Sequence, residues 1–332
     1  MADMPWPGAV AVSGGADSLA LMHLLARWTG KQTKSLAKPL VLSVDHGLRR
    51  ESAAEAKKVA RWAKALGLAH EILTVKGKKP KSDIEAWARQ QRYRLMGERL
   101  KKHGIAALYV AHHQDDQAET FLLRLSRGSG LDGLGAMRPL AAFPLPGFEG
   151  LSLVRPLLAL PRPRLREFLL SHKQDWLEDP MNGQTRFARS RIRALLPALE
   201  EAGLTAQRIA DAALHLARAR EALDMATAAV LARACRRENG VLLLDAQALA
   251  AAPREIGLRA LAGLLGNTGG QVYRPRFEAL ERLFDRLAGG ALGGGATLHG
   301  CRIAPAPRRL QHFGPNTLVI SREVPRSRET KA

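Results

Sequence analysis

The segment Gly8-Ala9-Val10-Ala11-Val12-Ser13-Gly14-Gly15-Ala16-Asp17-Ser18 decides the fold class of this chain. Its first five residues form an apolar run typical of a buried strand, and a helical pattern follows from Leu19 to Trp28. Between them, two adjacent glycines let backbone N–H groups approach an oxygen-rich ligand, and the helix start adds a positive dipole end. A plain strand-to-helix turn with a serine or aspartate cap is the alternative. We interpret the segment as a phosphate-binding loop, distinct from a Walker A loop because no lysine follows the glycines.

The alternation of strand and helix continues outward from this loop to about residue 170. Further apolar runs indicate strands at 40–44, 71–75 and 105–111, and helical patterns cover 51–66, 83–102 and 161–171. Another helix follows the polar residues 112–116 and ends at about Arg124. Strands separated by helices of this length predict βαβ units, and hence an α/β fold with a parallel sheet and helices on both faces. Ligands of such sheets bind at the carboxyl ends of the strands. The polar motifs after the first, second and fourth strands should therefore converge.

The rest of the chain predicts a second, smaller domain. Residues 128–150 are rich in glycine and proline and indicate a mobile loop insertion, and a long helix is expected from Thr205 to Arg237. Beyond it we expect helices at about 247–264 and 275–287, and short strands near 241–245, 297–304 and 317–322. The predicted organisation is a nucleotide-binding domain at 1–200, joined by the long helix to a small α+β domain within 204–332.

A second polar motif, His112-His113-Gln114-Asp115-Asp116-Gln117-Ala118-Glu119-Thr120, follows the fourth expected strand. Asp116 and Glu119 are spaced i and i+3, so both carboxylates lie on one helical face and can close on one cation. These residue types suit an ammonium ligand or Mg²⁺. A zinc site at His112, His113 and Asp115 lacks a further ligand at the usual spacing, and helix capping by Asp115 is the structural alternative. Asp17 of the first loop can hold Mg²⁺ against phosphates.

Composition narrows the class of protein further. The chain has 332 residues with 51 basic against 31 acidic side chains, a net charge of +20 that suits a polyanionic partner such as nucleic acid. Nine basic residues against four acidic ones lie between 155 and 193, where we assign nucleic-acid phosphate contacts to Arg155, Arg162, Arg164, Arg191 and Arg193. No apolar run reaches the roughly 18 residues of a membrane helix, and no secretory signal is evident. We expect a cytoplasmic protein that does not bind membranes.

Several motifs together resemble the tRNA(Ile)-lysidine synthetase family of N-type ATP pyrophosphatases. The segments that carry the resemblance are Ser13–Ser18, Val44–Arg49, Ala88–Tyr93, Ala111–Thr120, Arg127–Leu134, Trp176–Asn182, Phe187–Arg193 and Leu196-Pro197. They occur in the family's order over about residues 8–200. Beyond 204 the similarity is one of layout, and Gln184 and Ser190 stand where the family usually has Asp and Asn.

The resemblance implies a two-step reaction. ATP adenylates the C2 oxygen of the wobble cytidine in a tRNA(Ile) with a CAU anticodon, and the amine of free L-lysine then attacks C2, so that lysidine forms and AMP leaves. It implies ATP contacts at Ser13, Gly14, Gly15, Ala16, Asp17, Ser18, Asp45 and His46. It implies catalytic roles for Asp17, Arg92, His112, Asp116, Glu119 and Arg189. Of these, Asp116 and Glu119 would bind the lysine.

Two other functions fit the same scaffold. A tRNA thiolase also adenylates a base, yet such enzymes commonly need cysteine pairs or an iron–sulfur site, and residues 1–234 contain no cysteine. A non-catalytic RNA-binding protein could keep the fold, but the intact loop with Asp116 and Glu119 argues against it. The sequence leaves the oligomeric state open, with a homodimer as one option.

Overall fold

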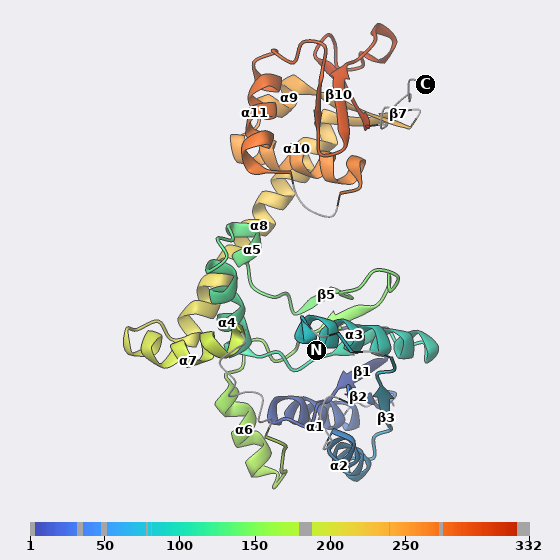
Figure 1. The fold of residues 1–332 in the computed structure, drawn as a ribbon, viewed down its shortest axis with the longest axis vertical. Coiled ribbons are helices and arrows are strands. Elements are labelled where there is room, and N and C mark those ends of the chain that lie inside the picture. Colours follow the sequence, from blue (N-terminus) through green and yellow to red (C-terminus); the bar gives the residue numbers. More distant parts are fainter. Residues whose placement is uncertain are drawn as a thin grey trace. The chain divides into compact units, whose positions relative to one another are not determined.

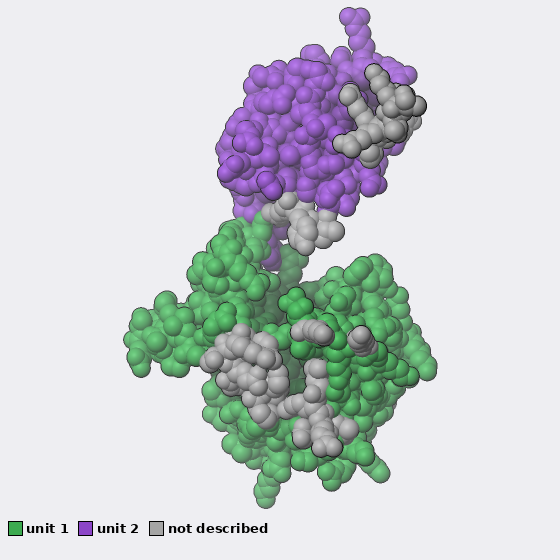
Figure 2. All heavy atoms as spheres, in the orientation of Figure 1, with its two compact units in different colours: residues 1–217 green, residues 218–332 purple. Residues whose placement is uncertain are grey.

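The computed structural model describes residues 4–31, 36–47, 52–77, 79–80, 82–178, 188–238, 240–271 and 275–323. The chain divides into two compact units, residues 1–217 and 218–332 (Figure 2). The division falls inside the long helix α8 (Ala206–Ala234), whereas the sequence places the domain boundary just before that helix.

The first unit is built on one six-stranded sheet. Its strands are β1 (Gly8–Ala11), β2 (Leu40–Asp45), β3 (His70–Thr74), β4 (Ala107–Tyr109), β5 (Leu140–Ala142) and β6 (Ser152–Val154). The spatial order is β3-β2-β1-β4-β6-β5, and all neighbours are parallel except the edge pair β5 and β6. The predicted parallel sheet is therefore confirmed, with one antiparallel edge strand added.

Helices cover both faces of this sheet (Figure 1). The helices of this unit are α1 (Ala16–Gly30), α2 (Ser52–Ala65), α3 (Ile84–Lys102), α4 (Gln114–Leu125), α5 (Leu131–Leu134), α6 (Arg162–Ser171) and α7 (Ala188–Glu201). Of these, α1, α2 and α6 pack on one face of the sheet and α3 packs on the other. Successive strand residues point to opposite faces, so Val10 packs with α1, α2 and α6 while its neighbour Ala9 packs with α3. Because both faces are buried at the centre of the sheet, β1, β2 and β4 are largely apolar runs without alternation.

Two parts of the first unit differ from the sequence-based expectation. Residues 128–150, expected as a mobile loop, contain the short helix α5 and the strand β5. Strand β6 was not predicted, because its three residues are too short to give a periodic signal. It joins β4 on one side and β5 on the other, which orders the insertion at the edge of the sheet.

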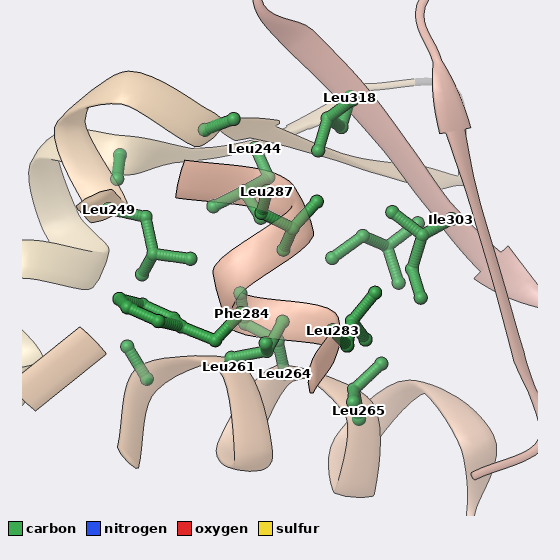
Figure 3. Close-up of a cluster of buried hydrophobic side chains, with 14 of the residues drawn as sticks. Leu244, Leu249, Leu261, Leu264, Leu265, Leu283, Phe284, Leu287, Ile303 and Leu318 are labelled. Atoms are coloured by element: carbon green, nitrogen blue, oxygen red, sulfur yellow. The ribbon is translucent and has the colours of Figure 1, made fainter. Parts of the chain in front are cut away.

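The second unit is a five-stranded antiparallel sheet with helices packed on it. Its elements are β7 (Cys235–Glu238), β8 (Val241–Asp245), α9 (Ala246–Ala250), α10 (Arg254–Gly269), α11 (Phe277–Ala288), β9 (Ala296–Leu298), β10 (Cys301–Pro305), η2 (Arg308–Leu310) and β11 (Thr317–Arg322). The strand order is β7-β8-β11-β10-β9. Phe284 of α11 lies at the centre of the core among leucines of α9, α10 and the strands (Figure 3).

The helix expected at 247–264 is two helices, α9 and α10, because Pro253 lies between them and cannot continue a helix. The long helix also ends three residues before the expected Arg237, where β7 begins as an edge strand. In the described ranges, no helix is long and apolar enough to cross a membrane.

Candidate active site

The glycine-rich loop after β1 has a fixed backbone conformation. Gly14 has φ +92°, in the left-handed region, and a Cβ there would lie 2.5 Å from Leu177 Cδ1. The Ser18 hydroxyl donates to the Gly15 carbonyl oxygen (2.9 Å) and accepts from the Ser13 amide (3.2 Å). The loop is therefore preformed, and glycine is required at position 14 by both conformation and space.

Asp17, in the first turn of α1, is an ionised carboxylate with one unused oxygen. Its Oδ2 lies 3.5 Å from His113 Nε2 and 3.7 Å from Arg162 Nε. Burial raises the pKa of this carboxyl, but His113 and the charges of Arg162 and Arg166 outweigh it, so the pKa is lowered. Its Oδ1 is buried and has no hydrogen-bond partner among the described residues. An orphaned carboxylate oxygen beside a phosphate-binding loop fits a metal ligand.

His113 is buried in the middle of three carboxylates. Its Nε2 lies 3.5 Å from Asp17 and 3.4 Å from Asp116, and its Nδ1 lies 3.2 Å from Asp115. Burial lowers the pKa of the imidazole, but the three carboxylates raise it to about 10, so the ring is charged at neutral pH. The His113 amide also donates to Asp116 Oδ2 (3.0 Å) at the start of α4. This imidazolium joins the loop after β1 to the motif after β4, as the convergence of strand ends predicts.

We expect the variant His113→Gln to lower the free energy of unfolding by about 3 kcal/mol, because loss of one partner of a buried charge pair leaves uncompensated charge. Chemical denaturation of the full chain measures the loss. His103→Gln is a matched control, since the His103 ring pairs with Glu71 at the surface with 39% of its side chain exposed, and there we expect less than about 1 kcal/mol. Equal losses in the two variants would contradict a structural role for His113.

The acidic residues of α4 have different partners. Asp115 Oδ2 accepts from the Arg162 amide (3.0 Å) and so caps the start of α6. The side chain of Glu119 is 3% exposed, and both of its oxygens accept from the Arg193 guanidinium, with 3.2 Å between Nη2 and Oε2. Arg193 Nη2 also lies 4.0 Å from Asp116 Oδ1. Asp116 and Glu119 do share one cation, and in this structure that cation is Arg193.

His112 is held as a neutral base at the end of β4. Its Nδ1 accepts from Arg155 Nε at 3.2 Å, so the proton of the neutral ring is on Nε2. Burial lowers its pKa to about 4, with Arg155, Arg89 and the exposed Arg189 adding to the effect and Asp116 opposing it. The ring therefore does not carry charge at neutral pH.

The end of β2 supplies a third group of residues. Asp45 Oδ1 accepts from the Gly47 amide and the Ser52 hydroxyl, both at 2.7 Å, and so orders the start of α2. Both ring nitrogens of His46 are buried without a hydrogen-bond partner in the described part of the chain. Burial and the charge of Arg92 lower the pKa of His46 to about 4. A neutral, unpartnered imidazole is suited to a hydrogen bond with a ligand.

The five arginines to which the sequence assigns nucleic-acid contacts fall into two groups in the structure. Arg164 and Arg191 are exposed. Arg155, Arg162 and Arg193 instead contact His112, Asp17 and Glu119 within the strand-end site. Residues 48–50 and 179–187, which include parts of the quoted motifs and Gln184, lie outside the described residues.

Sequence reasoning missed His113 and the partner of Glu119. The spacing of His113 to Asp116 is that of a capping box, and this is the one local signal in the sequence that points to His113. Arg193 lies 74 positions from Glu119 and has no local signal. No cluster of three or more His, Cys, Asp or Glu side chains suited to a metal occurs in the described ranges, so the zinc alternative has no support there.

Comparison with known proteins identifies the class. A parallel sheet with a glycine-rich loop after its first strand and acidic residues at a neighbouring strand end defines a PP-loop ATP-binding domain, and the family described as a PP-loop domain matches residues 7–199. The tRNA(Ile)-lysidine synthase of Ruegeria pomeroyi is 41% identical over 309 residues, 91% of this chain and 70% of the relative. The tRNA(Ile)-lysidine synthase of Methylobacterium nodulans is 43% identical over 322 residues, which cover 96% of this chain and 90% of the relative. The chain belongs to the tRNA(Ile)-lysidine synthase family, and the PP-loop domain implies that it binds ATP.

A solved structure shares the fold. The U34-tRNA thiolase of Methanococcus maripaludis, which holds a [4Fe-4S] cluster, matches with a TM-score of 0.51 at 16% identity, over 65% of this chain and 71% of its own. At this identity the likeness concerns the fold alone.

Proposed function

We propose that this protein ligates L-lysine to C2 of the wobble cytidine in a tRNA(Ile) with a CAU anticodon, through an adenylated tRNA intermediate. Lysidine, AMP and pyrophosphate are the products, and the change moves codon reading from AUG to AUA. The observation that supports it best is that His113 joins Asp17 of the glycine-rich loop to Asp116, which shares the Arg193 cation with Glu119. An ATP loop and an amine-binding carboxylate pair at one sheet edge are what such a ligation requires.

In the first step, the loop after β1 binds the ATP phosphates while the C2 oxygen of cytidine attacks the α-phosphorus and pyrophosphate leaves. Backbone N–H groups of the loop and the start of α1 stabilise the negative charge. Asp17 would hold Mg²⁺ through its free oxygen, with phosphates and water completing the coordination. Bound there, Mg²⁺ would neutralise charge on the phosphates. Arg92 and Arg189, both exposed, would contact the phosphates or the cytidine.

In the second step, the lysine amine attacks C2 and AMP leaves. Adenylation divides one difficult substitution into two easier ones, because AMP is a better leaving group than oxide. Lysine enters as an ammonium ion with a reference pKa of about 10.4, so it must lose a proton before it attacks. Asp116 and Glu119 bind the ammonium ion. Neutral His112 at the same strand end becomes a proton acceptor when Arg155 releases its Nδ1, because Nε2 already carries the proton of the neutral ring.

The rival functions predict different outcomes of one assay. We would measure AMP release from ATP with tRNA transcripts that bear CAU or another anticodon, with and without lysine, and identify the nucleoside by mass. AMP release and a lysidine mass that require both lysine and the CAU anticodon are expected. A thiolated base would favour the sulfur-transfer enzyme, whose cysteines this unit lacks. Binding of tRNA without AMP release would favour a non-catalytic RNA-binding protein.

A further inference from the structure

Glu119 is a buried carboxyl group whose partner in this structure is a cation. Its side chain is almost fully buried, and burial raises the pKa of the carboxyl, which Arg193 opposes. A buried carboxylate without a partner either becomes protonated or destabilises the fold. An amine that binds Glu119 must therefore displace the cation that pairs with this carboxylate in the structure.

The cation already present comes from a weakly attached helix. Arg193 reaches Glu119 from α7, 74 residues further along the chain, and binds both carboxylate oxygens. Along α7, which the structure describes from Ala188 to Glu201, no side chain is buried, and Leu195 leaves 48% of its surface exposed. Segments with few buried contacts open locally at low free energy. The Arg193 contact can therefore be released without disturbing the sheet.

The lysine ammonium and Arg193 have the same chemistry and the same acceptors. Arg193 lies on Glu119 and 4.0 Å from Asp116, the two carboxylates to which the proposed function assigns the amine. Arg193 already donates to both oxygens of Glu119 and lies beside Asp116, so an ammonium ion can bind the same carboxylate oxygens only by displacing the guanidinium. Occupation by one excludes the other.

We infer that Arg193 occupies the amine site in the tRNA-free protein and competes with free lysine, so that lysine binds only when α7 releases Glu119. Arg193 is thus a specificity-determining residue that keeps the amine site closed before the adenylated tRNA is present. This inference rests on the proposed function, since it takes lysine as the amine that Asp116 and Glu119 receive. The apparent affinity for lysine equals the intrinsic affinity of the open site multiplied by the fraction of protein in which that site is open.

A calorimetric titration of lysine into the full chain at pH 8, without tRNA, tests this competition by measuring the Kd for lysine. We expect Arg193→Gln to lower the Kd for lysine by about tenfold, as for a site open about a tenth of the time in the unaltered protein. Arg193→Lys restores a competing cation and should return the Kd toward the original value. Arg94→Gln, which removes an exposed arginine that pairs with Glu98, is the matched control and should leave the Kd unchanged.

The direction in which the Kd for lysine changes in Arg193→Gln distinguishes a competing Arg193 from one that helps lysine to bind. If Arg193 instead held Glu119 in place for lysine, Arg193→Gln would raise the Kd, and that result overturns the inference. An unchanged Kd, or no measurable binding to either protein, overturns it as well.

A second measurement needs no variant. Saturating lysine should increase hydrogen exchange of the α7 amides in the unaltered protein, and unchanged or reduced exchange contradicts the inference. Lysidine formation by the same preparation with tRNA tests the proposed function separately, so its loss and the loss of competition are distinguishable.

Discussion

Replacement of Asp17 by alanine is expected to abolish adenylation of tRNA while the first unit stays folded. Asp17 contributes the carboxylate with a free buried oxygen beside the phosphate-binding loop. Loss of a group that stabilises phosphate charge in the transition state costs on the order of 10³-fold in rate. His113 keeps Asp115 and Asp116 as partners, so the structural cost is modest. Exchange of labelled pyrophosphate into ATP in the presence of tRNA measures the first step alone.

Two further variants make the Asp17 result specific. Asp17→Asn keeps the shape of the side chain but removes its charge, and it should lose nearly as much activity. Glu98→Gln removes an exposed carboxylate that pairs with Arg94, and it should exchange at the normal rate. Near-normal exchange in both Asp17 variants would remove Asp17 from the ATP site, and a large fall in the unfolding temperature would show that the loss is structural.

The part of the fold that depends on periodicity was predictable. The central strands β1, β2 and β4 are largely apolar runs because helices bury both faces of the sheet there, and the helices α1, α2 and α3 are long enough to show their own patterns. The geometry of parallel sheets predicted that the motifs around Asp17 and Asp116 would converge. In the structure both residues contact His113. These inferences need only local residue types and one topological rule.

The remainder depends on contacts between distant residues. Strand β6 is three residues long and is defined by its neighbours rather than by its own pattern. The pairing of Glu119 with Arg193 has no counterpart in local spacing, and an arginine in a basic helix is as well explained by nucleic-acid contact as by a buried ion pair. Pro253, by contrast, is a local signal, because a proline within a helical pattern marks the boundary between α9 and α10.

His113 also explains why the two carboxylates assigned to lysine should not behave alike. Asp116 Oδ2 accepts from the His113 amide and lies 3.4 Å from its ring, so this residue contributes to the order of the loop after β4. Glu119 contacts Arg193, and its carboxylate is one turn further from Asp17 along α4. A change at Asp116 can therefore reach the ATP loop through His113, whereas a change at Glu119 should remain local to the amine site.

The variant Glu119→Gln should raise the lysine concentration needed for half-maximal lysidine formation by roughly ten- to a hundredfold. A charge-assisted hydrogen bond contributes about 1.5–3 kcal/mol, and each 1.4 kcal/mol is a factor of ten. Formation of adenylated tRNA without lysine should continue, because Glu119 does not belong to the phosphate loop. We would form the adenylated intermediate first and then follow its decay as lysine is titrated.

Asp116→Asn in the same assay decides between amine and metal for the pair. A raised lysine requirement with normal adenylation in both variants assigns the two carboxylates to the amine. Loss of adenylation in both, with the ordinary lysine dependence of what remains, would assign them to Mg²⁺ and contradict the lysine role. Loss of adenylation in Asp116→Asn alone would indicate that Asp116 acts on the ATP loop through His113, to which its Oδ2 is bonded. Glu119 would then be the main ligand of the amine, which agrees with its burial and with its present pairing to the cation of Arg193.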